Sequence, residues 1–282
     1  KILSFIPLFF IFNSNGMSHD CITMDDAKSI YKGFPNKLIT VIKKDITFEE
    51  AYCGQEKLNF LIKRNNNDQI GYKVGFTNKE SQKMFNINQP ATGVIYKHMF
   101  VKNEGTLDYN FGYQNLIEPD ILVIIKSKDI MQAKSNVDIL KNIHSLHPFL
   151  EIISYRFDPK TRVNGNMVIA TNMLATKMVM GKGIKVKATE DFILKLENIN
   201  TVFIKDENNI LQEAKTTNLM GSPLNVIKWL INDFNKRGIT LKKNDHISLG
   251  SIGKIFNLEK NSKYEYFFEG FENKLAVNIN IN

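Results

Sequence analysis

Three carboxylates interrupt apolar runs in the middle of the chain. Glu118 and Asp120 open the run Ile121–Ile125, and Glu151 stands inside a second run, Phe149–Ile153. Residues two apart on a strand point to the same face, so Glu118 and Asp120 share the row that continues into the first run. A carboxylate in a core-facing row is costly unless it is paired or coordinates a cation. The sequence therefore predicts that one divalent cation binds all three.

Two further segments carry groups that could act on an anionic ligand. Lys73 lies in the strand-like segment Gly71–Thr77, where its ammonium needs an anionic partner or loses its proton more easily. A lysine on a strand is otherwise a solvated side chain. Near the C-terminus, Gly250 and Ser251 offer backbone N–H groups and a hydroxyl of the kind that bind carboxylate oxygens.

The composition is that of a globular protein. With 282 residues, 43% of them hydrophobic, the chain can bury the core of one large domain, with or without a small helical extension. Its 37 basic and 29 acidic residues give a net charge of +8, but the basic residues are scattered. We therefore expect no nucleic-acid binding, and the charge indicates either a Lys-rich soluble surface or attraction of anionic substrates.

The N-terminal residues 1–16 resemble a secretory signal peptide. Lys1 precedes the apolar run Ile2–Phe12, which has the length of a signal-peptide core, about 7 to 15 residues. It is shorter than the about 20 residues that span a bilayer. We expect an exported protein, periplasmic or secreted, with no stable membrane insertion once the signal is removed; a buried or disordered terminus, in a cytoplasmic protein, is the alternative.

The two cysteines, Cys21 and Cys53, have no CxxC spacing, so a cysteine zinc site is not supported. In an exported protein they could pair. The alternative is two independent thiols.

Residue patterns predict helices in front of a mainly β body. Amphipathic spacing and a capping box formed by Thr47 and Glu50 predict a helix over 45–63, and a shorter one is expected over 78–85. A third helix is predicted from Ser222 to Gly238, with Pro223 in its first turn. Alternating or continuous apolar runs predict strands over 121–125, 149–155, 167–170, 201–205, 247–249, 264–268 and 275–279. The arrangement is α+β, with a helical section over 17–85 and a mainly β body over 86–282 within a single fold.

Several of these segments, taken in order, resemble the 2-keto-4-pentenoate hydratases of the fumarylacetoacetate hydrolase superfamily. The likeness covers roughly residues 45 to 280. The segments that carry it are Ala51–Gln55, Gly71–Thr77, Asn88–Pro90, Ile117–Asp120, Leu150–Ile153, Gly221–Leu230 and Ser248–Ser251.

The resemblance implies a mixed β-sandwich or roll and a homo-oligomer. It also implies that Glu118, Asp120 and Glu151 hold Mg²⁺ or Mn²⁺, and that Lys73 faces the substrate. Gln89, Gly250 and Ser251 are expected to contact that substrate. The activity implied is a hydro-lyase reaction on a small anionic 2-oxo or 2-hydroxydienoate acid such as 2-keto-4-pentenoate.

Three positions depart from the family pattern. Asp120 stands where Glu is common, Ala91 replaces an acidic residue after Gln-Pro, and Ser154 stands where another acidic residue is often found. The metal-binding part of the pattern is present, and the proton-transfer part is reduced. The alternatives are a decarboxylase or C–C hydrolase of the same superfamily, a secreted binding protein that keeps the fold without turnover, or acidic residues that are merely paired surface charges.

Overall fold

The computed structural model describes residues 21–42, 45–65 and 68–282. The predicted signal segment, residues 1–16, lies outside the described residues. Within the described part, no helix combines the length and the apolar composition that a membrane span requires.

Seven α-helices are described, and the three that the sequence predicts are confirmed. They are α1 (Met24–Lys32), α2 (Phe48–Arg64), α3 (Lys79–Met84), α4 (Asn136–Lys141), α5 (Gly165–Ala170), α6 (Glu190–Glu197) and α7 (Pro223–Arg237). Thr47 and Glu50 form the expected capping box of α2. Ser222 caps α7, and Gly238 ends that helix in the left-handed conformation, which glycine adopts without a steric penalty.

Fourteen strands are described, and together with the helices they confirm the α+β class. The strands are β1 (Gln69–Gly75), β2 (Ala91–Tyr96), β3 (Phe100–Val101), β4 (Gly105–Leu107), β5 (Asn115–Ile125), β6 (Ile143–Ser154), β7 (Lys177–Met180), β8 (Ile184–Lys185), β9 (Asn200–Lys205), β10 (Asn209–Lys215), β11 (His246–Ser248), β12 (Phe256–Asn257), β13 (Lys263–Phe268) and β14 (Leu275–Ile281).

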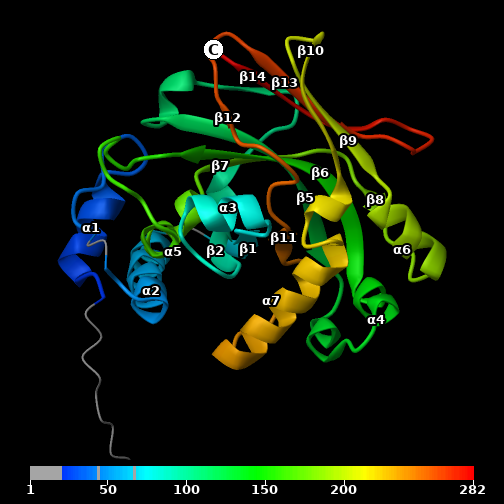
Figure 1. Cartoon of the computed structure of the whole chain (residues 1–282), viewed down its shortest axis with the longest axis horizontal. Helices are drawn as coiled ribbons and strands as arrows, with labels where there is room; N and C mark the ends of the chain where they lie inside the picture. The colour runs from blue at the N-terminus through cyan, green and yellow to red at the C-terminus, as the bar shows by residue number, and fades with distance from the viewer. Residues whose placement is uncertain (1–20, 43–44, 66–67) are drawn as a thin grey trace, which may run out of the picture.

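The strands form two sheets. The larger has the order β2-β1-β11-β5-β6-β7-β3, with β12 and β8 attached to β5 and β6, and the smaller has the order β10-β9-β13-β14-β4. Strands β13 and β14 pack against β6, so the two sheets share a core. In Figure 1 the smaller sheet lies at the top, α1 and α2 lie together at the lower left, and α7 lies at the lower centre.

Two sequence predictions need correction. Residues 167–170, predicted as a strand, lie in α5, because Asn164 accepts a hydrogen bond from the Met167 N–H at 3.0 Å and so caps a helix there. A short apolar run does not distinguish a buried strand from a buried helix turn. The section over 17–85 is not purely helical either, since β1 lies within it and belongs to the larger sheet.

The long strands β5 and β6 separate two apolar clusters. Odd-numbered residues of β5 such as Ile121 and Val123 face the main core, which α7 and the smaller sheet complete. Leu122, on the other face, packs in a smaller cluster with Ile95 and Phe149. Glu118 and Asp120 share the face of Leu122, so the strand directs them away from the main core.

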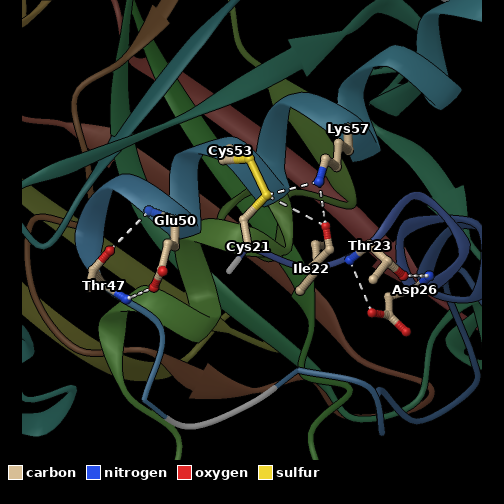
Figure 2. The surroundings of a disulfide bond; sticks show 8 residues. All are labelled: Cys21, Ile22, Thr23, Asp26, Thr47, Glu50, Cys53 and Lys57. Atoms are coloured by element: carbon tan, nitrogen blue, oxygen red, sulfur yellow. Dashed lines mark hydrogen bonds between the residues drawn. A yellow bond between two sulfur atoms is a disulfide. The ribbon is translucent and has the colours of Figure 1, made fainter. Parts of the chain in front are cut away.

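The disulfide Cys21–Cys53 joins the start of α1 to α2. Cys21 lies two residues before Thr23, the N-cap of α1, and Cys53 lies in the second turn of α2. Figure 2 shows Lys57 beside this bond, with its ammonium donating to the Ile22 carbonyl at 2.8 Å and lying 2.9 Å from the Cys21 Sγ. The structure thus pairs the two cysteines, which the sequence allowed but did not require.

Candidate active site

The structure brings the three carboxylates and the lysine together on one face of the larger sheet. Glu118 on β5 lies directly opposite Glu151 on β6, and Asp120 is two residues further along β5. Lys73 reaches them from β1 and forms an ion pair with Glu151 Oε1. All four residues are buried, with exposed fractions of 8% or less. The cluster is therefore shielded from water, which strengthens its electrostatic interactions.

Lys73 is held by an unusual turn. The short 3₁₀ segment η4 (Asn172–Leu174) contains three consecutive residues with positive φ, of 56°, 55° and 56°. The Met173 carbonyl accepts a hydrogen bond from Lys73 Nζ at 3.2 Å. Left-handed backbone at non-glycine residues costs about 1 kcal/mol or more per residue, so packing must hold this turn in place.

A glycine on the neighbouring strand, β2, allows the η4 turn to pack close to that strand. Gly93 on β2 pairs with Lys73, and a Cβ at Gly93 would lie 2.9 Å from the Met173 Cβ and 3.0 Å from the Asn172 carbonyl oxygen. The Asn172 side chain adds two hydrogen bonds to the backbone of Val94, at 2.7 and 3.0 Å. The glycine in the Ala-Thr-Gly-Val segment therefore accommodates protein backbone rather than a ligand.

Asp120 is held by hydrogen bonds from β11 and from the segment after it. The Ser248 hydroxyl donates to Asp120 Oδ2, and the Ile121 N–H donates to Oδ1. The Gly250 N–H also donates to this carboxylate. Three donors orient a carboxylate whose side chain is one methylene shorter than that of glutamate.

The buried carboxylates resist ionisation. Burial, reinforced by the charge of Glu151, raises the pKa of Glu118 to about 8, although Lys73 opposes the change. Burial also raises the pKa of Asp120 to about 7, although the hydrogen bond from Ser248 opposes it. With all four groups ionised the cluster carries two excess negative charges, and a divalent cation would relieve that repulsion.

The donor set fits a hard divalent cation. Carboxylate oxygens are the ligands that Mg²⁺ and Mn²⁺ prefer, and Glu151 Oε1 is buried, with the Lys73 ammonium as its ion-pair partner. As the side chains lie, however, no group of three His, Cys, Asp or Glu residues in the described ranges is arranged to hold an ion. The ammonium of Lys73 and the hydroxyl of Ser248 occupy carboxylate oxygens instead. The assignment of Glu118, Asp120 and Glu151 as metal ligands therefore stays a prediction.

The residues expected to bind substrate lie in different places. Gly250 and Ser251 lie at the cluster, but their donors serve the protein itself: the Gly250 N–H donates to Asp120, and the Ser251 hydroxyl, which lies near Glu118, donates to the Gly253 carbonyl at 3.1 Å. Gln89 is exposed and lines a separate cavity of about 440 Å³ that none of the four charged residues lines. The structure thus does not bring Gln89 to the cluster.

The two positions that lack an acidic residue are built into the core. Ala91 is fully buried and packs in the apolar cluster that contains Phe76 and Met173. The Ser154 hydroxyl donates to the Pro35 carbonyl and accepts from the Tyr113 N–H, both at 2.8 Å. Neither side chain can transfer a proton to a bound molecule.

Sequence reasoning missed two groups of the cluster. The sequence predicts no role for Ser248, although its pairing with Lys73 across β1 and β11 places it beside Asp120. The Met173 carbonyl left no signal, because positive φ at an Asn-Met-Leu segment cannot be inferred from residue type.

Comparisons with known proteins support the resemblance. No family model matches the chain. The 2-keto-4-pentenoate hydratase of Paraburkholderia phymatum is 21% identical over 78% of this chain and 82% of its own length. The 2-hydroxypent-2,4-dienoate hydratase of Pseudomonas putida is 26% identical over 69% of this chain and 86% of its own length. The structure of 4-oxalocrotonate decarboxylase from Pseudomonas putida G7, complexed with magnesium and adipate, superposes with a TM-score of 0.79 at 18% identity, covering 92% of this chain and 97% of that one.

Proposed function

Because this chain is a relative of the 2-keto-4-pentenoate hydratases and has the fold of the fumarylacetoacetate hydrolase superfamily, we propose that it is a divalent-metal-dependent hydro-lyase. Its substrate would be a small anionic 2-oxo or 2-hydroxydienoate acid such as 2-keto-4-pentenoate. The observation that carries the proposal is the buried group formed by Lys73, Glu118, Asp120 and Glu151 on one sheet face. A charged cluster of this composition has no structural advantage over apolar packing.

Glu118, Asp120 and Glu151 would hold Mg²⁺ or Mn²⁺. The ion, when bound, supplies Lewis-acid stabilisation of the negative charge that develops on the oxygen of a 2-oxo acid. The chain's own groups prepare the site: Ser248 and Gly250 fix Asp120, and the η4 turn fixes Lys73.

Lys73 has two roles in this scheme. Its ammonium offsets the charge of Glu151 until a cation takes that role. With Glu151 engaged in holding a cation, the ammonium would be free to pair with the substrate carboxylate or to donate a proton to the carbon skeleton. Burial at 4% exposure keeps water from screening that charge.

The test is a hydration assay on 2-hydroxypenta-2,4-dienoate with the mature, oxidised protein. Loss of the dienoate absorbance should require added Mg²⁺ or Mn²⁺ and should be abolished in Glu151→Gln. Glu213→Gln, an exposed glutamate on β10, serves as the matched control and should keep full activity. Turnover in the metal-free protein, or full activity in Glu151→Gln, would contradict the proposed role of the cluster.

Decarboxylation is the second candidate reaction, and Ala91 favours it. Hydration needs groups that deliver water and a proton, and positions 91 and 154 carry none. An unsaturated 2-oxo dicarboxylic acid can lose its far carboxylate as carbon dioxide and leave the electron pair as a dienolate on the keto oxygen. This step needs mainly stabilisation of negative charge, which a divalent cation held by the cluster would provide. Carbon dioxide release from 4-oxalocrotonate, without hydration of the dienoate, would select this reaction; binding of 2-oxo acids without any turnover would select the degenerate binding protein.

We also propose that the protein is exported and self-associates. The disulfide Cys21–Cys53 supports export, since such bonds persist in oxidising compartments. Fractionation of the producing cells and light scattering of the purified protein test these two points. A cytoplasmic protein with free thiols would contradict the first, and a monomer would contradict the second.

A further inference from the structure

A second cavity lies between the N-terminal helices and the larger sheet. It has a volume of about 420 Å³, which is within the range of small-molecule sites. Its walls come from α1, α2 and the segment that follows β2, and include Ile30, Leu58, Ile62 and Met99. None of the four charged residues of the candidate active site lines this cavity. It is therefore a separate place for a ligand.

One wall of this cavity holds a buried arginine. Arg156 follows β6 and is 3% exposed. Burial lowers the pKa of its guanidinium to about 10, so the group stays charged at neutral pH. Across the described residues, no aspartate or glutamate forms an ion pair with it. A buried charge without a counter-charge is costly, and such a group is a natural anchor for an anion.

The guanidinium retains donors for a ligand. Its Nη1 donates to the Ile30 and Lys37 carbonyls, both at the long distance of 3.3 Å, and its face lies 5.2 Å from the centre of the Phe34 ring. No hydrogen bond from Nε or Nη2 to a described group is found. A guanidinium edge matches the two oxygens of a carboxylate. The helix-anchoring role of Arg156 thus uses only part of its hydrogen-bonding capacity.

The rest of the cavity selects the body of the ligand. Aliphatic and aromatic side chains together form most of its walls, so a long polar molecule would lose hydration without gaining partners. Lys32 is an exposed residue at its margin and extends the favourable potential for an anion outward. His98, also at the margin, adds no charge at neutral pH, because partial burial lowers the pKa of its imidazole. The combination is one charged anchor and an apolar enclosure.

We propose that this cavity binds a small monocarboxylate with an apolar body, anchored by Arg156. The chemical class is a medium-chain fatty or aryl carboxylate of on the order of ten heavy atoms, as the cavity volume allows. The proposal is independent of the hydro-lyase function, since it shares no side chain with the carboxylate cluster.

The cavity also borders the turn that holds Lys73. Thr171 and Asn172 line it, and the next residue, Met173, provides the carbonyl that accepts from Lys73. A ligand in the cavity would therefore contact the segment that positions the lysine.

Calorimetric titration with octanoate and octanamide tests the proposal. The full oxidised protein is used after removal of metal with a chelator, so that carboxylate binding at an ion is excluded. We expect octanoate to bind with a dissociation constant in the micromolar to millimolar range and octanamide, with the same chain, to bind at least about tenfold more weakly. Equal affinity for the two, or no octanoate binding, would overturn the proposal.

Protein variants locate the binding. Arg156→Met should abolish octanoate binding, whereas Arg64→Met, at an exposed arginine on α2, should not change it. Because Arg156 also anchors α1, Ala175→Leu provides a second test: it adds volume to the cavity wall, leaves the guanidinium intact, and should also weaken binding. Glu151→Gln should bind octanoate as the unmodified protein does. Loss of binding in Glu151→Gln, or unchanged binding in both Arg156→Met and Ala175→Leu, would assign octanoate to another site.

Discussion

Replacing Glu118 with glutamine is expected to stabilise the metal-free protein, and more so at high pH. The ordinary pKa of this carboxyl is 4.5, and burial together with the Glu151 charge raises it to about 8 in the folded protein. Between these values the folded chain holds a proton that the unfolded chain has released. The free energy of unfolding therefore falls as pH rises through this window.

The size of the effect follows from the shift. One unit of pKa corresponds to about 1.4 kcal/mol, so the ionisable Glu118 costs the metal-free fold about 1 kcal/mol at pH 5 and about 5 kcal/mol at pH 8.5. Glutamine has nearly the same shape and no charge. The free energy of unfolding of the Glu118→Gln protein should therefore exceed that of the unmodified protein by several kcal/mol at pH 8.5 and by far less at pH 5.

Urea denaturation at the two pH values, followed by the fluorescence of Trp229 in the presence of a chelator, measures the difference. Glu213→Gln is the control and should follow the unmodified protein at both pH values, because this glutamate is exposed on β10. A stability difference between Glu118→Gln and the unmodified protein that is the same at both pH values would refute the reasoning. So would a destabilised variant at pH 8.5. Added Mn²⁺ should then stabilise only the protein that retains Glu118.

Three further changes test other parts of the structure. Lys73→Met leaves the Glu151 carboxylate buried without its counter-charge and should lower the free energy of unfolding at neutral pH by roughly 3–5 kcal/mol in urea melts. Ala91→Asp introduces an acidic residue after Gln-Pro, at the first residue of β2, and should increase hydration of 2-hydroxypenta-2,4-dienoate if the substrate pocket is intact; an unchanged rate, measured by dienoate absorbance, would favour the decarboxylase or binding alternatives. Cys53→Ser removes a cross-link across 32 residues and should lower stability by roughly 3–4 kcal/mol, and a reducing agent should have the same effect on the unmodified protein and none on the variant.

Local rules explain which parts of the fold the sequence predicted. The capping box of Thr47 and Glu50, and the Ser-Pro start and glycine end of α7, act within one helical turn, so residue spacing alone identifies them. The two-residue periodicity of a strand likewise placed Glu118 and Asp120 on one face, as the pairing of β5 with β6 shows. The strand prediction for residues 167–170 was wrong because their short apolar run fits a strand as well as a helix. The contact that decides for a helix is the Asn164 cap.

The partners of the site residues depend on long-range packing and could not be predicted. Gly250 and Ser251 have donors suited to carboxylates, and the sequence assigned those donors to a substrate. The structure gives the Gly250 N–H to Asp120 and the Ser251 hydroxyl to the Gly253 carbonyl, because β11 pairs with both β1 and β5 and brings this segment alongside the cluster. Contact of these two residues with a substrate stays a prediction.

The electrostatics of the cluster suggest why this chain keeps the predicted metal-binding carboxylates but has no acidic residue at the two proton-transfer positions, 91 and 154. Removing any one of Glu118, Asp120 and Lys73 changes the charge of a buried group whose members already oppose or offset one another, so each substitution affects the others. Ala91 and Ser154, in contrast, interact with groups outside the cluster. Ala91 packs against apolar neighbours, and the Ser154 hydroxyl hydrogen-bonds to backbone groups. A chain can therefore lose acidic groups at these two positions without destabilising the cluster. With a divalent cation bound, the remaining cluster would stabilise negative charge on a 2-oxo acid, and the choice between adding water and releasing carbon dioxide would then depend on the available proton donor.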